Sequence, residues 1–312
     1  MHTRAARGRT LPYRQPARGA SARSASLEVR NSIVTKCVEV RGVKIGEGIP
    51  KIIVPIVGTT KREILEAASS IMESALKGSA LGENAFGKNA LGDNVFGEKV
   101  FDLVEWRTDW FDDVFEFGKV EDVLKELREE LGDIPLLFTF RTAREGGEKA
   151  ISVDEYKRLN IMAAQTGLVD LIDVEAFTGD DVVREIIEEA HKAGVKVVGS
   201  NHDFDKTPEK EEIVRRLRRM QELGADIPKI AVMPRGSADV LTLIAATQEM
   251  SSQYAEGPII TMSMSGTGLV SRLCGEVFGS SCTFGTVGKA SAPGQIGAEE
   301  LGGILRVIHT NL

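Results

Sequence analysis

Two hydrophobic patterns alternate along most of the chain. Short runs that are apolar throughout, such as Ile52-Ile53-Val54, are typical of strands covered on both faces. Longer segments repeat apolar residues every three or four positions, as at Ile64 and Ala68, and this predicts helices with one buried face. The predicted strands are 51–57, 101–106, 135–140, 169–174, 197–204, 227–234, 258–262 and 282–286. The predicted helices are 61–76, 120–131, 153–166, 181–193, 209–223, 238–250, 269–278 and 298–308.

Eight strand–helix units over about 260 residues have the size and order of a closed barrel. We therefore predict an α/β fold, a (β/α)₈ TIM barrel. Alternating Val38 and Val40, followed by Val43, predict a short N-terminal hairpin that covers the barrel floor. The alternative is a doubly wound open sheet, but no Gly-rich dinucleotide fingerprint follows the first predicted strand.

Charge divides the chain near residue 34. Residues 1–34 contain seven arginines and one glutamate, whereas the whole chain has a net charge of −7. This segment lacks the apolar core of a secretory signal. We expect residues 1–34 to be a disordered or non-native basic leader, with an organelle-targeting peptide as the alternative. Residues 35–312 are expected to form the barrel domain.

A tandem five-residue repeat interrupts the pattern at residues 79–98. Its four copies read SALGE, NAFGK, NALGD and NVFGE. Stacked repeat folds generally need more units to bury a core, so we expect a loop insert on the surface. A loop between a helix and the next strand lies at the N-terminal face of a barrel, away from the chemistry. An interaction loop or a coil of a β-solenoid is the alternative.

Cysteine content, charge and hydropathy bear on location and partners. The three cysteines, Cys37, Cys274 and Cys282, are odd in number and lack metal-ligand spacing, as expected for reduced thiols. An acidic chain disfavours general nucleic-acid binding. No apolar run approaches the ~18 residues that would span a bilayer. We therefore expect a cytoplasmic protein with no nucleic-acid, membrane or metal partner.

Polar residues collect at the predicted carboxyl ends of the strands, which meet at one mouth of a barrel. Glu105 and Arg107 are two residues apart and so share a face of their strand. Lys229 lies nearer the start of its strand, so its side chain must extend up the barrel. The residues at the strand ends and in the loops that follow them are Glu105, Arg107, Arg141, Glu145, Asp173, Glu175, His202, Lys229, Met262, Met264, Arg272, Ser291 and Gln295.

His202 and Lys229 lie on neighbouring predicted strands and can face one pocket. A lysine amine attacks a carbonyl only when it is neutral, and burial or nearby cations favour that state. An imidazole titrates near neutrality, as acid–base catalysis requires. The pair is therefore a candidate for imine chemistry. The alternatives are a lysine that reaches solvent at a strand entrance and a structural histidine.

Three arginines at the mouth, Arg107, Arg141 and Arg272, indicate an anionic substrate, because a guanidinium matches a carboxylate in bidentate geometry. The alternative is that they form salt bridges with Glu105, Glu145 or Glu175. For Asp173 and Glu175, orienting a basic residue is favoured over a role as a paired acid and base.

Nine short segments carry a resemblance to a known family. They are EWR at 105–107, FTFR at 138–141, EGGE at 145–148, SNHDF at 200–204, PKIAVMP at 228–234, TMSM at 261–264, SRL at 271–273, GEVFG at 275–279 and SAPGQ at 291–295. In combination they are highly specific, and the chain resembles the type I 3-dehydroquinate dehydratases of the shikimate pathway over about residues 36–310. The leader and the repeat lie outside this resemblance.

The resemblance implies a homodimeric hydro-lyase of aromatic amino acid biosynthesis that uses no metal and no other cofactor. It would convert 3-dehydroquinate to 3-dehydroshikimate and water. Lys229 would form a Schiff base with the ring ketone, His202 would act as general base and then acid, and Glu145 would orient His202. Arg272, Ser291 and Gln295 would hold the substrate carboxylate. The ring hydroxyls and the carbonyl region would contact Glu105, Arg107 and Arg141.

Two other functions remain compatible with the residues. A class I aldolase shares the barrel and the lysine imine, but it needs no clamp of three arginines on a cyclic carboxylate. An inactive barrel could instead act as a scaffold whose repeat at 79–98 recruits a partner. Turnover of dehydroquinate distinguishes the dehydratase from both.

Overall fold

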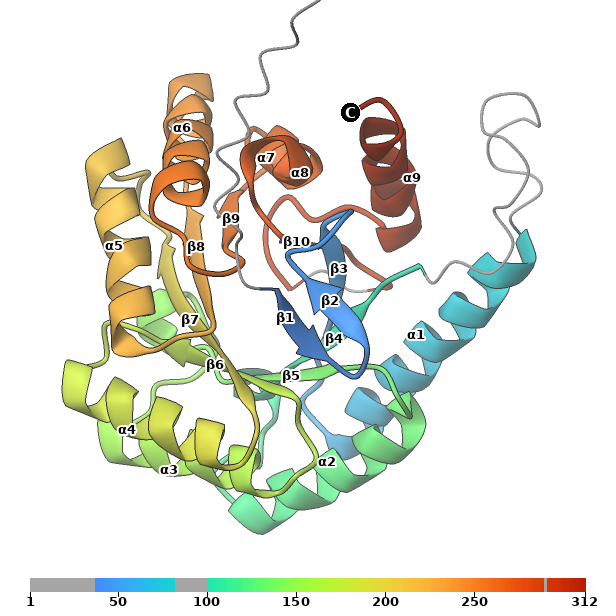
Figure 1. The fold of residues 1–312 in the computed structure, drawn as a ribbon. Helices are drawn as coiled ribbons and strands as arrows, with labels where there is room; N and C mark the ends of the chain where they lie inside the picture. Colours follow the sequence, from blue (N-terminus) through green and yellow to red (C-terminus); the bar gives the residue numbers. More distant parts are fainter. Residues whose placement is uncertain (1–36, 82–99, 289–290) are drawn as a thin grey trace, which may run out of the picture. The chain divides into compact units, whose positions relative to one another are not determined.

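Eight parallel strands form the centre of the fold (Figure 1), in a computed structural model that describes residues 37–81, 100–288 and 291–312. These residues belong to one compact unit that extends from residue 32 to residue 312. Nearly every strand residue is buried, as continuous apolar runs predict. The strands are β3 (Lys51–Ile56), β4 (Leu103–Arg107), β5 (Leu136–Thr139), β6 (Leu171–Glu175), β7 (Lys196–Asp203), β8 (Ile227–Val232), β9 (Ile260–Ser263) and β10 (Cys282–Phe284).

The sheet closes on itself. Its order is β10-β3-β4-β5-β6-β7-β8-β9, so the last strand in the chain pairs with the first strand of the barrel. Three residue pairs join β10 to β3, with Thr283 opposite Ile52 at their centre. At the remaining seam, between β9 and β10, a single parallel bridge links Ile259 to Ser280. The predicted TIM barrel is therefore confirmed, and the open doubly wound sheet is wrong.

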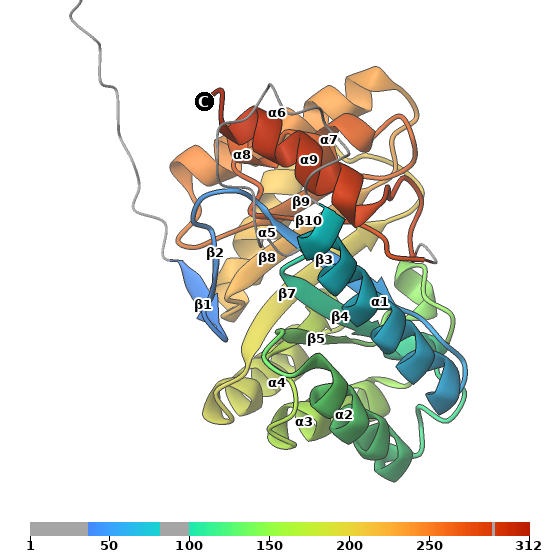
Figure 2. The ribbon, with the colours of Figure 1, turned by 90° about the vertical axis from the view of Figure 1, so that its right-hand side faces the viewer.

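Helices lie outside the ring of strands (Figures 1 and 2) and bury their apolar faces against it. The segment 269–278, predicted as one helix, is two short helices separated at Cys274. Gly275 lies so close to the Ser280 carbonyl that a Cβ atom would come within 2.7 Å of that oxygen. The helices are α1 (Lys61–Leu81), α2 (Phe117–Leu131), α3 (Val153–Gln165), α4 (Asp180–Lys192), α5 (Lys210–Leu223), α6 (Ser237–Gln253), α7 (Leu269–Leu273), α8 (Gly275–Phe278) and α9 (Ala298–His309).

A two-stranded hairpin covers the floor of the barrel, as the alternating valines predict. It consists of β1 (Val38–Val40) and β2 (Val43–Ile45), which pair antiparallel. Its apolar side chains pack into the same cluster as inward-facing residues near the starts of the barrel strands. Arg41 at the hairpin turn also pairs with Asp170, whose carboxylate lies 2.7 Å from the guanidinium.

The leader at 1–34 and repeat residues 82–98 lie outside the described residues, whereas repeat residues 79–81 complete α1. The three cysteines form no disulfide. Within the described ranges no helix combines the length and hydropathy needed to cross a membrane, and no group of His, Cys, Asp and Glu has the arrangement of a metal site.

Candidate active site

All nine residues proposed from the sequence for catalysis or substrate binding line one cavity at the carboxyl ends of the strands. The cavity and its opening to solvent together contain about 510 Å³ of space free of protein atoms. Apolar side chains complete its wall. Its lining consists of Glu105, Arg107, Arg141, Glu145, Gly146, His202, Phe204, Lys229, Ala231, Met262, Met264, Arg272, Phe284, Ser291, Ala292 and Gln295.

Arg107 is held by Asp109, a partner that the sequence did not suggest. After β4 ends at Arg107, a 3₁₀ turn (Thr108–Trp110) brings Asp109 back beneath the guanidinium. The two carboxylate oxygens of Asp109 accept bonds from Nε and Nη2 of Arg107, both at 2.8 Å. Burial lowers the pKa of Arg107, but the hydrogen-bonded charge of Asp109 outweighs it, so the guanidinium stays charged.

Asp109 also connects two loops. Its oxygens accept the backbone N–H groups of Arg141, at 3.3 Å, and Glu148, at 3.1 Å. The carboxylate is fully buried. It therefore fixes Arg107 relative to the loop that follows β5.

Arg141 is surrounded by acidic groups from strand β6 and from the loop that follows β5. Its Nη2 lies 2.8 Å from Asp173 Oδ1, and its Nη1 lies 3.0 Å from Glu175 Oε1 and 3.5 Å from Glu145 Oε2. Burial opposes the charge of Arg141, but Asp173 and Glu175 outweigh it and raise its pKa well above the usual value. The salt-bridge alternative is therefore correct for Arg141, and Asp173 and Glu175 do orient a basic residue.

Glu145 makes two hydrogen bonds to His202 and a third to its neighbour Asn201. Glu145 Oε2 accepts the His202 backbone N–H at 2.8 Å and lies 3.0 Å from Nδ1 of the ring, while Oε1 accepts Asn201 Nδ2 at 3.0 Å. Burial raises the pKa of Glu145 to about 7 even though Arg141 lowers it. The loop depends on Gly146, which has φ of 81° and lies against the ring of Phe204, leaving no room for a side chain.

His202 is neutral in this environment. Burial and then the positive charges of Arg141, Lys229 and Arg107 lower its pKa well below the usual value. Its side chain keeps 12% of its surface accessible and lines the cavity. Because Nδ1 is bonded to Glu145, the other ring nitrogen, Nε2, is the one available to a molecule in the cavity.

Lys229 extends from β8 into the barrel interior, with only 4% of its side chain accessible. Its Nζ lies 3.1 Å from Asp173 Oδ2, 3.9 Å from Glu105 Oε1 and 4.7 Å from the centre of the Phe284 ring. Ser200 on β7 lies opposite Lys229 in the strand register, and His202 is two residues further along the same strand. The structure thus brings the imidazole and the amine to one cavity, and the lysine does not reach bulk solvent.

Arg272 differs from the other two arginines because no carboxylate pairs with it among the described residues. It is 2% accessible. Its Nη1 contacts Met262 Sδ at 3.4 Å, its Nη2 donates to the Pro293 carbonyl at 3.2 Å, and its Nε has no partner. Burial lowers its pKa to about 10, so it remains a cation at neutral pH. A buried guanidinium without a counter-ion indicates a site for an anion.

Ser291 and Gln295 lie beside Arg272 on the last loop and bond to each other. Gln295 Oε1 accepts the Ser291 backbone N–H at 3.0 Å, and Gln295 Nε2 donates to Ser291 Oγ at 3.2 Å. The Ser291 carbonyl accepts from Arg107 Nη1 at 3.4 Å. The loop is therefore connected to the opposite wall of the cavity.

Sequence reasoning missed Asp109, Ser200 and Phe284. Ser200 is fully buried and donates to Asp173 Oδ1 at 2.5 Å. A signal existed for it, because Ser200 and His202 are two apart on one strand and so point the same way. Phe284 gave no such signal, since an aromatic residue in a short apolar run is ordinarily part of the core.

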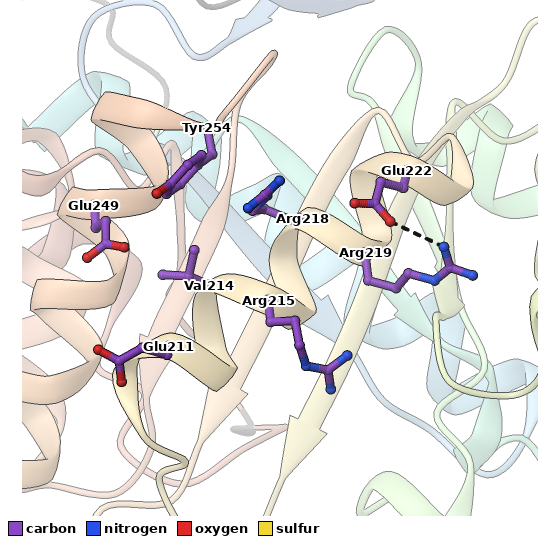
Figure 3. Close-up of a pocket in the computed structure, with 8 residues that line it drawn as sticks. All are labelled: Glu211, Val214, Arg215, Arg218, Arg219, Glu222, Glu249 and Tyr254. Carbon is purple, nitrogen blue, oxygen red and sulfur yellow. Dashed lines mark hydrogen bonds and ion pairs between the residues drawn. The ribbon is translucent and has the colours of Figure 1, made fainter.

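A larger cleft lies outside the barrel, between α5 and α6, with about 750 Å³ of free space (Figure 3). Its cations are already engaged: Arg215 pairs with Glu212, Arg219 pairs with Asp180 and Glu222, and Arg218 stacks 4.7 Å from the Tyr254 ring centre. None of the strand-end residues lines it, so volume alone does not identify the site.

The sequence is similar to proteins of known activity over nearly its whole described length. A family model described as type I 3-dehydroquinase matches residues 94–312. The 3-dehydroquinate dehydratase of Clostridium botulinum is 52% identical over 277 residues, which cover 89% of this chain and 99% of the relative. That of Clostridioides difficile is 52% identical over 275 residues, 88% of this chain and 98% of the relative.

Solved structures give the same result for the fold. The type I 3-dehydroquinate dehydratase of Clostridium difficile, solved with covalently modified comenic acid, matches with a TM-score of 0.78 and 52% identity over 89% of this chain and all of that one. The 3-dehydroquinate dehydratase of Geobacillus kaustophilus matches with a TM-score of 0.78 and 34% identity, over 88% and 97%.

Proposed function

Because the chain belongs to the type I 3-dehydroquinase family, we propose that it converts 3-dehydroquinate to 3-dehydroshikimate and water. The observation that carries this proposal is the buried Arg272, a cation that no carboxylate of the described residues pairs with, in a cavity that also holds Lys229 and His202. This set suits a substrate with a carboxylate at one end and a ketone at the other. Membership of the family and a site with these three groups support the same activity.

Lys229 is the proposed nucleophile. Its nitrogen adds to the ring ketone, and loss of water leaves a protonated imine. The positive imine withdraws electrons from the neighbouring carbon, and a proton there becomes easier to remove. The 3.1 Å contact with Asp173 holds the amine inside the cavity, where it can meet the substrate.

His202 is the proposed base and acid. Its lowered pKa keeps it neutral and able to accept the proton, through Nε2, while Glu145 holds Nδ1. The same proton can then be given to the departing hydroxyl group, so that water leaves and the imidazole returns to its neutral state. Hydrolysis of the imine finally releases the product and restores Lys229.

The remaining predicted residues are proposed to bind substrate. Arg272, with Ser291 and Gln295 beside it, would hold the carboxylate. Arg107 and Arg141 already have carboxylate partners, so we assign them to neutral oxygens, the ring hydroxyls and the carbonyl region. Glu105 accepts from Thr139 Oγ1 at 2.9 Å and keeps its second oxygen for a hydroxyl group.

Borohydride trapping tests the mechanism directly. The enzyme is incubated with 3-dehydroquinate and sodium borohydride, digested, and mapped by mass spectrometry. We expect the reduced adduct on Lys229 and none in Lys229→Ala. The matched control is Lys196→Met, because Lys196 starts the neighbouring strand β7 at the floor and pairs with Asp226 at 3.2 Å. This variant should be trapped at Lys229 as wild type is.

Three outcomes would overturn the proposal. An active enzyme whose Lys229 stays unmodified would exclude the imine mechanism. Cleavage of an aldol substrate, with no enone absorbance from dehydroquinate, would favour the class I aldolase. Absence of any turnover in a folded protein would favour the scaffold.

A homodimer and a cytoplasmic location are also proposed. Supporting the first, four exposed apolar side chains lie on the successive helices α6 to α9: Leu241, Val270, Val277 and Val307. Light scattering should give twice the mass of one chain, and the double variant Leu241→Glu with Val277→Glu should have the mass of a single chain. An unchanged mass in this variant would exclude a dimer interface formed by these side chains.

The three free cysteines support the proposed cytoplasmic location. Cell fractionation tests it.

A further inference from the structure

The carboxylate of Asp173 divides its two oxygens between different tasks. Asp173 is fully buried in the middle of β6. Its Oδ1 accepts from Arg141 Nη2 at 2.8 Å and from Ser200 Oγ at 2.5 Å. Its Oδ2 accepts from Lys229 Nζ at 3.1 Å. The first oxygen is therefore fixed by two donors, and the second faces the amine.

Barrel geometry explains why these residues meet. Side chains that point inward from alternate strands share a layer of a barrel interior. Asp173 on β6 and Lys229 on β8 are such a pair, and Ser200 on the intervening strand β7 lies opposite Lys229 in register. The contact is thus built from rigid strands and not from a loop.

Asp173 is the carboxylate that hydrogen-bonds to Lys229. Glu105 is the next nearest acidic group, but its Oε1 lies 3.9 Å away and accepts from Thr139 Oγ1. The charge of Lys229 also acts on His202 on β7 and on Cys282 on β10, and Arg141, after β5, shares the Asp173 carboxylate with the amine. Among these groups Asp173 is the anion best placed to balance a charge on Nζ.

We infer that Asp173 is the counter-ion of the Lys229 nitrogen throughout the reaction proposed above, first for the ammonium and then for the protonated imine. The inference rests on that proposed function. When an ammonium and a ketone become a protonated imine and one water, nitrogen loses two hydrogens and keeps one, and its charge stays +1. One N–H thus remains to donate to Oδ2, and the same ion pair serves both states.

The surroundings keep Asp173 ionised for this role. Burial opposes its charge, but Arg141 and Lys229 outweigh burial, and the pKa of Asp173 falls below its usual value. Arg141 is balanced in turn by Glu175, at 3.0 Å. Asp173 can therefore pair with Arg141 and Lys229 at the same time.

Asp173→Asn tests the inference, with borohydride trapping as the readout. Because an unpaired buried cation is strongly disfavoured, we expect the rate of imine formation and kcat to fall together by about 100-fold or more, with KM changed little. Loss of the carboxylate also favours the neutral amine, so the pH at which trapping is half-maximal should move lower. A merely structural defect would reduce the amount of active enzyme without moving this pH.

Two further variants make the test decisive. Asp170→Asn changes the same residue type three positions earlier, at the floor end, and should form the imine at the wild-type rate. If Asp173→Asn does not fold, Ser200→Ala carries the test, since it keeps every charge but removes one of the two donors to Oδ1. We expect Ser200→Ala to slow imine formation by about 5-fold to 10-fold.

The results separate the two levels of the proposal. Failure to trap Lys229 in the wild-type enzyme would overturn the proposed function. Trapping of wild type together with wild-type rates and pH dependence in Asp173→Asn, or with a wild-type rate in Ser200→Ala should Asp173→Asn not fold, would overturn the counter-ion role and leave the proposed function standing.

Discussion

The floor and the mouth of the barrel are built from the same strands but use their acidic residues differently. At the floor, three aspartates each lie just before a strand and accept a backbone N–H from the strand next to it. Asp170, for example, accepts from Leu136 at 2.9 Å. The three pairs are Asp102 with Ile52, Asp170 with Leu136 and Asp226 with Val197. These carboxylates tie neighbouring strands together.

At the mouth, acidic residues mainly hold cations that face a cavity. Asp109 positions Arg107, and Asp173 positions both Arg141 and Lys229. Arg272 has no acidic partner at all among the residues described. Buried charge of this kind contributes little to stability and often reduces it. The acidic residues of the floor thus stabilise the barrel, whereas those of the mouth hold cations in place around the cavity.

Replacing His202, the proposed general base at the mouth, should give the largest change in kcat. His202→Ala removes the group proposed to move the proton, so kcat should fall by about 10³-fold while Lys229 is still trapped by borohydride. His191→Ala is the matched control, because His191 lies outside the cavity on α4 and contacts Asp226 at 2.7 Å. It should leave kcat unchanged. Full turnover in His202→Ala would remove this residue from the mechanism.

Arg272→Met should separate binding from stability. Losing the cation proposed to bind the substrate carboxylate should lower kcat/KM by about 100-fold. Removing an unpaired buried charge should at the same time raise Tm by a few degrees. The counterpart is Arg128→Met, since Arg128 donates to the Gly132 and Ile134 carbonyls near the floor. It should lower Tm and leave kcat/KM unchanged. A lower Tm in Arg272→Met would contradict the view that the unpaired guanidinium destabilises the fold.

Asp170→Asn should affect the floor alone. Its carboxylate accepts from Leu136 and pairs with Arg41 and Arg128, so the free energy of unfolding should fall by about 1–3 kcal/mol. Urea denaturation measures the change, and kcat should stay at the wild-type value. Asp133→Asn, at a fully exposed carboxylate, should have no measurable effect. A large loss of kcat in Asp170→Asn would show that this residue of the floor also contributes to catalysis.

The pH dependence of stability should show the smallest effect. Burial raises the pKa of Glu145 to about 7, so the stability it contributes is present at acidic pH and is lost as pH rises toward 7. Glu145→Gln cannot ionise. The difference in Tm between this variant and wild type should therefore shift in favour of the variant from pH 5 to pH 8. A constant difference would show that Glu145 ionises at its usual pH.

The sequence was sufficient to predict the barrel because its signal is local. Each strand is an apolar run and each helix has a periodic apolar stripe. Few folds other than a barrel accommodate eight consecutive units of this pattern. The break at Cys274 was not predictable, since it depends on the approach of Gly275 to Ser280, a contact that only the folded chain creates. Helix ends differed by a few residues for the same reason.

The sequence was sufficient to predict which residues form the candidate site, but not which residues they pair with. Strand ends converge by topology, so the nine residues could be gathered from their positions. Which arginine would remain without a carboxylate could not be inferred, because the partners come from other strands or from a turn, as Asp109 and Asp173 do. The distinction between Arg107, Arg141 and Arg272 therefore emerged only from the three-dimensional arrangement.

The single bridge between β9 and β10 has a consequence for how the barrel opens. The joint between the first and last strands must hold together segments more than 200 residues apart, and it has full pairing. The weak joint lies between strands that a short connection already keeps close, so separating them releases little chain. Because a single backbone bridge closes this seam, which borders Met262 and Arg272, amide exchange should be fastest along it. Local opening of the barrel would thus admit solvent to the wall that carries Arg272, while the other strand pairs stay closed.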